Sequence, residues 1–143
     1  MAIRPQQTVT STTPPAVELL AKTVQVKRTD TTAFDAFWLP KNAVLAGAYV
    51  LGLTASDAGT TALIHVGTNP GTTNDVLASF DVKGATGQGY AAAGAKGGTA
   101  MGTQMTADTL MKAVYVETGT ASATGGPWLV KVEYYIPQQG YTF

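Results

Sequence analysis

Catalysis by histidine would have to use His65, because it is the one histidine of the sequence. A hydrolytic triad needs a serine and an aspartate that converge on the imidazole ring. Ser56 and Asp57 lie nearby in the sequence, across a turn, but no serine has the surroundings of a nucleophile elbow. His65 shares one face of a strand pattern with Thr61 and Leu63. We therefore expect a partly exposed strand histidine and no catalytic triad.

Pairs of carboxylates could supply hydrolytic acid and base chemistry. The candidate pairs are Asp30 with Asp35 and Asp75 with Asp81. A glycosidase also needs a cleft with aromatic platforms, and the sequence around neither pair indicates one. Asn69, Asn74 and Asp75 offer oxygen ligands for calcium, but their spacing matches no defined calcium loop. No metal site is predicted.

The glycine clusters do not form a phosphate-binding loop. Such a loop needs Gly-Lys-Ser/Thr directly before a helix. Residues 84–89 read Gly-Ala-Thr-Gly-Gln-Gly, and residues 96–99 read Lys-Gly-Gly-Thr with no helix pattern behind them. We expect no nucleotide, no other cofactor and no enzymatic activity.

Charge is scarce in this sequence. Charged residues make up 13% of the chain and the formal net charge is +0, whereas a charged share of about 25% is usual. A weakly charged surface is poorly protected against self-association. This favours a protein that works in an assembly, the alternative being an ordinary domain with a threonine-rich exterior.

The composition also argues against several partners. Nine basic residues balance nine acidic ones, and no basic cluster exceeds Lys27 and Arg28, so a nucleic-acid footprint is not expected. No apolar stretch approaches the roughly 20 residues that span a membrane. The first residues lack the apolar core of a secretory signal, and without cysteine there are no disulfides.

Short apolar runs closed by Gly, Thr, Asn or Pro recur along most of the chain. Runs of this kind are typical of an all-β, antiparallel β-sandwich. The predicted strands cover 23–28, 33–39, 44–53, 61–67, 76–82, 110–116 and 128–136. A short helix after Asn74 and Asp75 is the alternative for the fifth segment. We expect the last two segments to form a hairpin, and glycines within 44–53 to mark a bulge or a close approach.

Two segments stand outside this pattern. Residues 1–16 read as an extended N-terminal arm before a single sandwich domain at 17–143, because Pro14 and Pro15 enforce extended backbone. Residues 83–105 are rich in Gly and Ala and are predicted to be a long projecting loop. Tyr90, Met101 and Met105 have no obvious core partner there, which suggests an oligomer contact.

Several short motifs resemble small structural proteins of tailed bacteriophages. They are Leu-Pro-Lys-Asn-Ala-Val at 39–44, Gly-Thr-Thr-Ala-Leu at 59–63, Val-Gly at 66–67, and Leu-Val-Lys-Val-Glu-Tyr at 129–134. The resemblance covers about residues 33–67 and 110–137 and leaves 83–105 without a counterpart. It implies a jelly-roll-like sandwich, often trimeric, on the virion.

Within that family, the pattern best fits a capsid decoration, or cement, protein on the capsid surface, made in the host cytoplasm. Its partner would be the major capsid protein, and its oligomeric state a homotrimer. A head-fibre or tail-associated module that binds a receptor or carbohydrate is the alternative, with Tyr49, Tyr135 and Tyr141 as exposed aromatics. The arm residues expected to contact the capsid are Ile3, Arg4, Gln6, Val9, Pro14 and Pro15.

Overall fold

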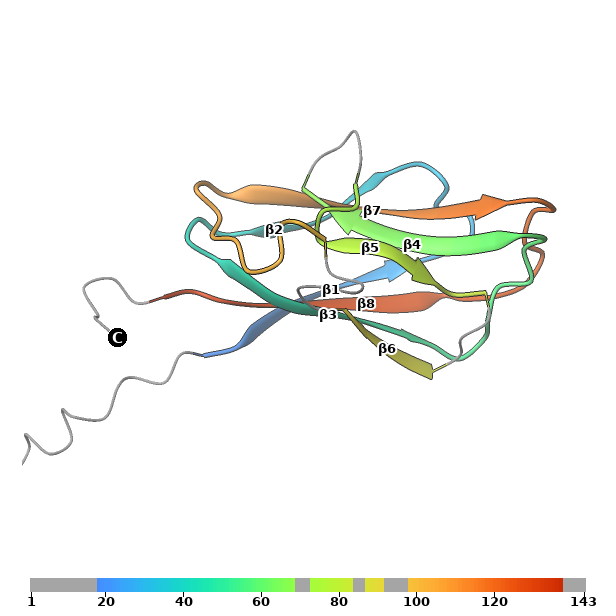
Figure 1. Ribbon diagram of the computed structural model, residues 1–143, viewed down its shortest axis with the longest axis horizontal. Coiled ribbons are helices and arrows are strands. Elements are labelled where there is room, and N and C mark those ends of the chain that lie inside the picture. The colour runs from blue at the N-terminus through green and yellow to red at the C-terminus, as the bar shows by residue number, and fades with distance from the viewer. Residues whose placement is uncertain (1–17, 69–72, 84–86, 92–97, 138–143) are drawn as a thin grey trace, which may run out of the picture.

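The computed structural model describes residues 18–68, 73–83, 87–91 and 98–137 (Figure 1). Every regular element among them is a β-strand. The strands are β1 (Leu20–Val26), β2 (Phe34–Leu39), β3 (Val44–Gly52), β4 (Thr61–Gly67), β5 (Leu77–Asp81), β6 (Gly87–Ala91), β7 (Thr109–Thr118) and β8 (Trp128–Tyr135). The predicted all-β class is confirmed, and the alternative of a helix after Asn74 is wrong.

The strands form two four-stranded antiparallel sheets that face each other. One sheet has the order β1-β8-β3-β6 and the other the order β2-β7-β4-β5. Except for β4 and β5, consecutive strands belong to opposite sheets, so the chain crosses back and forth over one shared core. This is the strand order of a jelly roll. The predicted jelly-roll-like sandwich is therefore confirmed, whereas the predicted arm lies outside the described residues.

The core lies between the inner faces of the two sheets. On β8 the side chains alternate as expected, with Trp128, Val130, Val132 and Tyr134 buried. Burying a large apolar side chain contributes about 1.5–3 kcal/mol, so the buried side chains between the sheets supply the main force that holds the layers together. The predicted bulge in β3 is present, as a register shift between Leu45 and Gly47.

The last two strands do not form the predicted hairpin. β7 pairs with β2 and β4, while β8 pairs with β1 and β3 in the opposite sheet. Each strand has one strongly apolar face, and that face is equally well buried whether the two strands pair or face each other. The loop between them is long enough to bridge the roughly 10 Å that separates packed sheets, so burial alone did not decide the pairing.

The segment predicted as a projecting loop, 83–105, is partly built into the sandwich. β6 lies within it and pairs with β3 at one edge of a sheet. Met101 and Met105 are 8% and 7% exposed and belong to the core. The Met105 amide donates to the Ala43 carbonyl at 2.8 Å. Contacts within the chain therefore account for both methionines.

The two ends of the sandwich are closed in different ways. At one end, which we call the Trp128 end, β1 and β3 finish beside the start of β8. At the opposite end, the Met105 end, β2 finishes and β3 and β7 begin, and the segment around Met105 covers the core (Figure 1). The turn after β2 lies here, and Asn42 adopts a left-handed φ of 73° in it, a conformation that asparagine tolerates well.

Candidate functional site

A buried hydrogen-bond cluster closes the Trp128 end. Ser56 Oγ lies 2.7 Å from the Tyr115 hydroxyl and donates to Ser122 Oγ at 3.0 Å. The Tyr115 hydroxyl also donates to Glu117 Oε2 at 2.9 Å, and the Tyr115 ring stacks on Trp128 with centroids 5.4 Å apart. Burial, followed by the neighbouring Glu117 carboxylate, raises the pKa of Tyr115 despite its hydrogen bond with Ser56, which acts in the opposite direction. The hydroxyl therefore stays protonated and serves as a structural link.

Asp57 organises the loop that covers this cluster. Its Oδ1 accepts hydrogen bonds from the backbone amides of Ala123 and Thr124 at 2.9 and 2.8 Å and from Ser122 Oγ at 2.8 Å. These bonds, first the one from the Thr124 amide and then the one from Ser122, lower the pKa of Asp57 from 3.8 to about 2. The carboxylate therefore anchors the loop before β8 and is not a proton donor at neutral pH.

The residues considered for a catalytic triad do not converge in this geometry. Ser56 and Asp57 bond to Tyr115 and Ser122, as described above, and not to His65. His65 Nδ1 instead accepts a hydrogen bond from the Ser79 amide at 3.3 Å. Burial lowers the pKa of His65 below 6.5, so the ring is neutral at neutral pH. It is half-buried on β4, as the strand pattern predicts.

Each aspartate considered for paired-acid chemistry has a structural partner of its own. Asp30 accepts from the Lys27 amide at 2.7 Å, and Asp35 forms an ion pair with Lys112 at 2.5 Å. Asp75 binds the backbone amide and hydroxyl of Thr68, and Asp81 accepts from the Lys83 amide at 2.8 Å. Within the described part of the chain, no three His, Asp or Glu side chains gather as a metal site.

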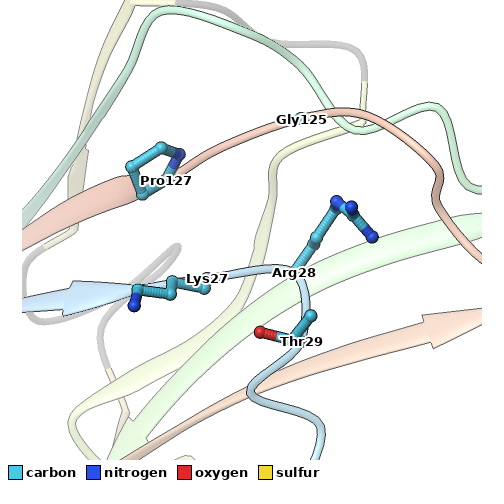
Figure 2. Close-up of a pocket in the computed structure, with 5 residues that line it drawn as sticks. All are labelled: Lys27, Arg28, Thr29, Gly125 and Pro127. Carbon is cyan, nitrogen blue, oxygen red and sulfur yellow. The ribbon is translucent and has the colours of Figure 1, made fainter.

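A shallow basic pocket lies beside the Trp128 end. It measures about 250 Å³ and is lined by Lys27, Arg28, Thr29, Gly125 and Pro127. Figure 2 shows the Arg28 side chain reaching toward the segment that carries Gly125, while the Lys27 side chain extends away beneath Pro127. Arg28 Nη1 donates to the Ser122 carbonyl at 3.1 Å. The guanidinium is therefore committed to tying the loop before β8 to the end of β1.

The outer face of the β1-β8-β3-β6 sheet has an apolar patch near the same end. Leu51 and Leu129 are cross-strand partners, 45% and 44% exposed, and Leu53 beyond β3 is 86% exposed. Further along this face, the Lys131 ammonium lies 5.4 Å from the centre of the Tyr49 ring. Cation–π contact of this kind occupies the ring face that a sugar would stack on.

A second apolar site lies where the two sheets meet at their edges, toward the Met105 end. Trp38 on β2 is 59% exposed and, together with Pro40 and Tyr134, lines a pocket of about 320 Å³. Lys22 and Asp108 lie at the polar margin of the pocket. Phe37 and Trp38 are adjacent in a strand, so the sequence required one of them to face outward. The pocket itself could not be predicted, because its lining also includes Asp108 and Tyr134, which are distant from Trp38 in the sequence.

The residues predicted to make intermolecular contacts have different locations. The arm residues Ile3, Arg4, Gln6, Val9, Pro14 and Pro15 lie outside the described residues. Tyr90 lies on β6, at the register position opposite Tyr49. Met101 and Met105 are in the core, as described above, which removes the argument that placed them at an oligomer contact, although that contact remains untested. None of the described elements is a helix that could cross a membrane.

Comparisons with known proteins found similar solved structures but no match by sequence. No family model matches the sequence, and no curated protein matches it. A chain of the acidic stable capsid structure of Helicobacter pylori bacteriophage KHP30 aligns with a TM-score of 0.60 and 15% identity, covering 86% of this chain and 92% of that chain. A chain of the cyanophage Pam1 capsid asymmetric unit aligns with a TM-score of 0.57 and 22% identity, covering 85% of each chain.

A chain of the capsid of Ralstonia phage GP4 has a TM-score of 0.56 and 22% identity, covering 99% of this chain and 92% of that chain. The protein shares its fold with chains of phage capsid structures. The match extends over nearly the whole length of each of the three capsid chains.

Proposed function

We propose that this protein is a virion structural protein that decorates a phage capsid. As a decoration, or cement, protein, it would bind the shell of the major capsid protein and stabilise the mature head. The observation that carries the proposal is the likeness of its jelly roll to chains from three phage capsid structures, over at least 85% of this chain in each case.

The described surface supports a role in docking rather than in turnover. The polar side chains that could do chemistry are engaged in structural hydrogen bonds and ion pairs, and Leu51, Leu53, Leu129 and Trp38 lie exposed. Exposed apolar groups on a weakly charged protein are typical of surfaces that are covered in an assembly. The alternative of a carbohydrate-binding module has less support, because Lys131 occupies the face of Tyr49.

The physical mechanism is linkage between binding and the state of the shell. A protein that binds the expanded shell better than its precursor stabilises the expanded state by mass action. Many copies that bridge neighbouring capsid subunits would add avidity. We propose that the arm, residues 1–16, contributes by adding an extended segment to a neighbouring subunit, and that the protein acts as a homotrimer.

The proposal is tested by binding to expanded heads that lack the protein. Full-length protein should bind them and raise the temperature at which they rupture. Deleting Met1–Pro15 should leave the circular-dichroism spectrum unchanged and abolish binding, whereas the control deletion of 138–143 should retain it. Failure of the full-length protein to bind would reject the decoration role, and full occupancy by the arm-deleted variant would reject the role of the arm alone.

A further inference from the structure

The pocket around Trp38 lacks a partner among the described residues and has a defined chemistry. Its apolar surface comes from Trp38, Leu39, Pro40 and Tyr134, and its margin carries the Lys22 ammonium. Asp108, the other charged group, already accepts the Lys41 amide at 2.9 Å. The pocket therefore offers the exposed Trp38 ring together with the Lys22 ammonium as a hydrogen-bond donor.

The position of the pocket follows from the open edge between the two sheets. Lys22 is the cross-strand partner of the buried Val132, so its side chain points toward the inner face of an edge strand. An inward-pointing charge on an edge strand protects that edge against pairing with the edge of another sheet. Because β1 and β2 touch along this edge, the pocket beside Lys22 is bordered by both sheets.

A proline pair is the segment of this chain that best fits such a pocket. Aromatic grooves recognise proline-rich segments because the polyproline helix is already ordered before it binds. Proline has no backbone N–H and presents only carbonyl acceptors, which complements a pocket that offers a donor. Pro14 and Pro15 lie next to each other, outside the described residues.

The arm joins the sandwich close to this pocket. Leu20, the first residue of β1, is the cross-strand partner of Tyr134, which lines the pocket. Leu19 and Ile136, just beyond the ends of these strands, are 56% and 37% exposed and extend the apolar surface toward the arm. Pro15 is five residues before Leu20, a separation of about 17 Å in extended chain.

The arm of the same copy is poorly suited to fill its own pocket. Entering beside Lys22 would require the chain to reverse direction within Ala16, Val17, Glu18 and Leu19. This stretch has none of the Gly, Pro, Asn, Asp or Ser residues that favour tight turns. An arm that instead entered the pocket of a neighbouring molecule would need no such reversal, and a closed ring of such contacts would give every copy one arm to donate and one pocket to fill.

We infer that the Pro14 and Pro15 segment of one copy docks in the Trp38 pocket of a second copy. The pyrrolidine rings pack against Trp38, while a carbonyl of the proline segment accepts a hydrogen bond from Lys22. This contact concerns the isolated protein and goes beyond the proposed binding to shells. The inference assigns Pro14 and Pro15, which the sequence analysis expected to contact the capsid, to a second copy instead. The first residues of the arm remain available for a capsid subunit.

Fluorescence can follow this contact selectively, because the two tryptophans differ in exposure. Trp38 is 59% exposed and Trp128 is 1% exposed, so acrylamide quenching reports on Trp38, with a Trp38→Phe variant giving the background. In the full-length protein, quenching should fall several-fold as concentration rises from nanomolar to hundred-micromolar, in step with an increase in mass above the monomer. The double variant Pro14→Ala/Pro15→Ala should stay quenchable and lose the larger species.

Matched controls test whether the shielding of Trp38 depends specifically on Pro14 and Pro15 and on association of two copies. Pro5→Ala, in the same arm, and Leu53→Ala, at the exposed Trp128 end, should behave as the wild-type protein does. A peptide of residues 10–19 should restore shielding to the double proline variant. Trp38 that stays open at every concentration, shielding that survives loss of both prolines, or proline-dependent shielding in a monomer would each overturn the inference. None of these outcomes bears on whether the protein binds shells.

Discussion

The two ends of the sandwich are closed by different combinations of hydrogen bonds. At the Trp128 end, main-chain bonds such as that from the Gly126 amide to the Thr54 carbonyl are joined by a side-chain cluster of Ser56, Tyr115, Ser122 and Asp57. At the Met105 end, the main chain closes the core, with the Met105 amide donating to Ala43 and the Gly102 amide donating to Leu45, at 2.8 and 2.9 Å. An end specified by side chains depends on particular residue types, whereas an end specified by the backbone tolerates their replacement.

This difference suggests that the two ends of the sandwich have different roles. The Trp128 end is a fixed cap, whose buried polar groups are satisfied only in one arrangement. The Met105 end carries the flexible side chains of Met101 and Met105 and the Trp38 pocket. In the proposed assembly, variation needed to match a partner would therefore accumulate at the Met105 end without loss of the fold.

The largest effect is expected from removing the aromatic centre of the cap. Trp128→Ala should lower the free energy of unfolding by about 3–5 kcal/mol, because it leaves a cavity beside Tyr115. At the opposite end, Met105→Ala should cost less, about 2 kcal/mol, because a mostly backbone-bonded segment can relax into the space. Urea denaturation measures both. An equal cost at the two ends would contradict the comparison.

The indole N–H of Trp128 allows a second test of the aromatic centre of the cap. It is buried without a hydrogen-bond partner among the described residues. Trp128→Phe should therefore be much milder than Trp128→Ala, because it keeps an aromatic ring against Tyr115 and removes an unsatisfied donor.

A smaller effect is expected from the hydrogen bonds of the cap. Ser56→Ala removes the partner of both the Tyr115 hydroxyl and Ser122, and should lower the free energy of unfolding by about 1–3 kcal/mol. The control is Thr103→Ala near the Met105 end, where an exposed hydroxyl donates to the Thr99 carbonyl at 3.4 Å, and its effect should stay within about 0.5 kcal/mol. If both variants unfold at the same urea concentration, the cap does not depend on its side chains.

Local alternation was sufficient to predict much of the fold. The strand Thr61–Gly67 and the buried face of β8 follow from residues two apart in the sequence, where apolar and polar side chains alternate. β6 was missed because Gly87–Ala91 has few bulky side chains to mark a strand. The pairing of β7 with β2 and β4 was missed because hydrogen-bond partners are chosen by the whole topology.

The cap and the Trp38 pocket could not be predicted from local sequence patterns either. The cap residues lie in a turn, a strand and a loop, and their spacing in the sequence does not predict that they meet. They are Ser56, Tyr115 and Ser122. The outward position of one residue in the Phe37 and Trp38 pair could be expected, but its pocket depends on the edge between β1 and β2. Sites built from separate strands emerge only once the sheets are assembled.

The smallest expected effect is the pH dependence of the cap, because Asp57 is an exposed carboxylate. Its pKa is lowered from 3.8 to about 2 in the folded protein, so the unfolded chain takes up the proton first as the pH falls. The stabilisation is complete above pH 3.8 and is lost as the pH falls through that value toward about 2. Asp57→Asn should lower the melting temperature at neutral pH and flatten its fall in acid, whereas the control Asp81→Asn should keep the wild-type profile. A melting curve of Asp57→Asn that falls in acid as steeply as the wild-type curve would show that the loop before β8 is not held by this carboxylate.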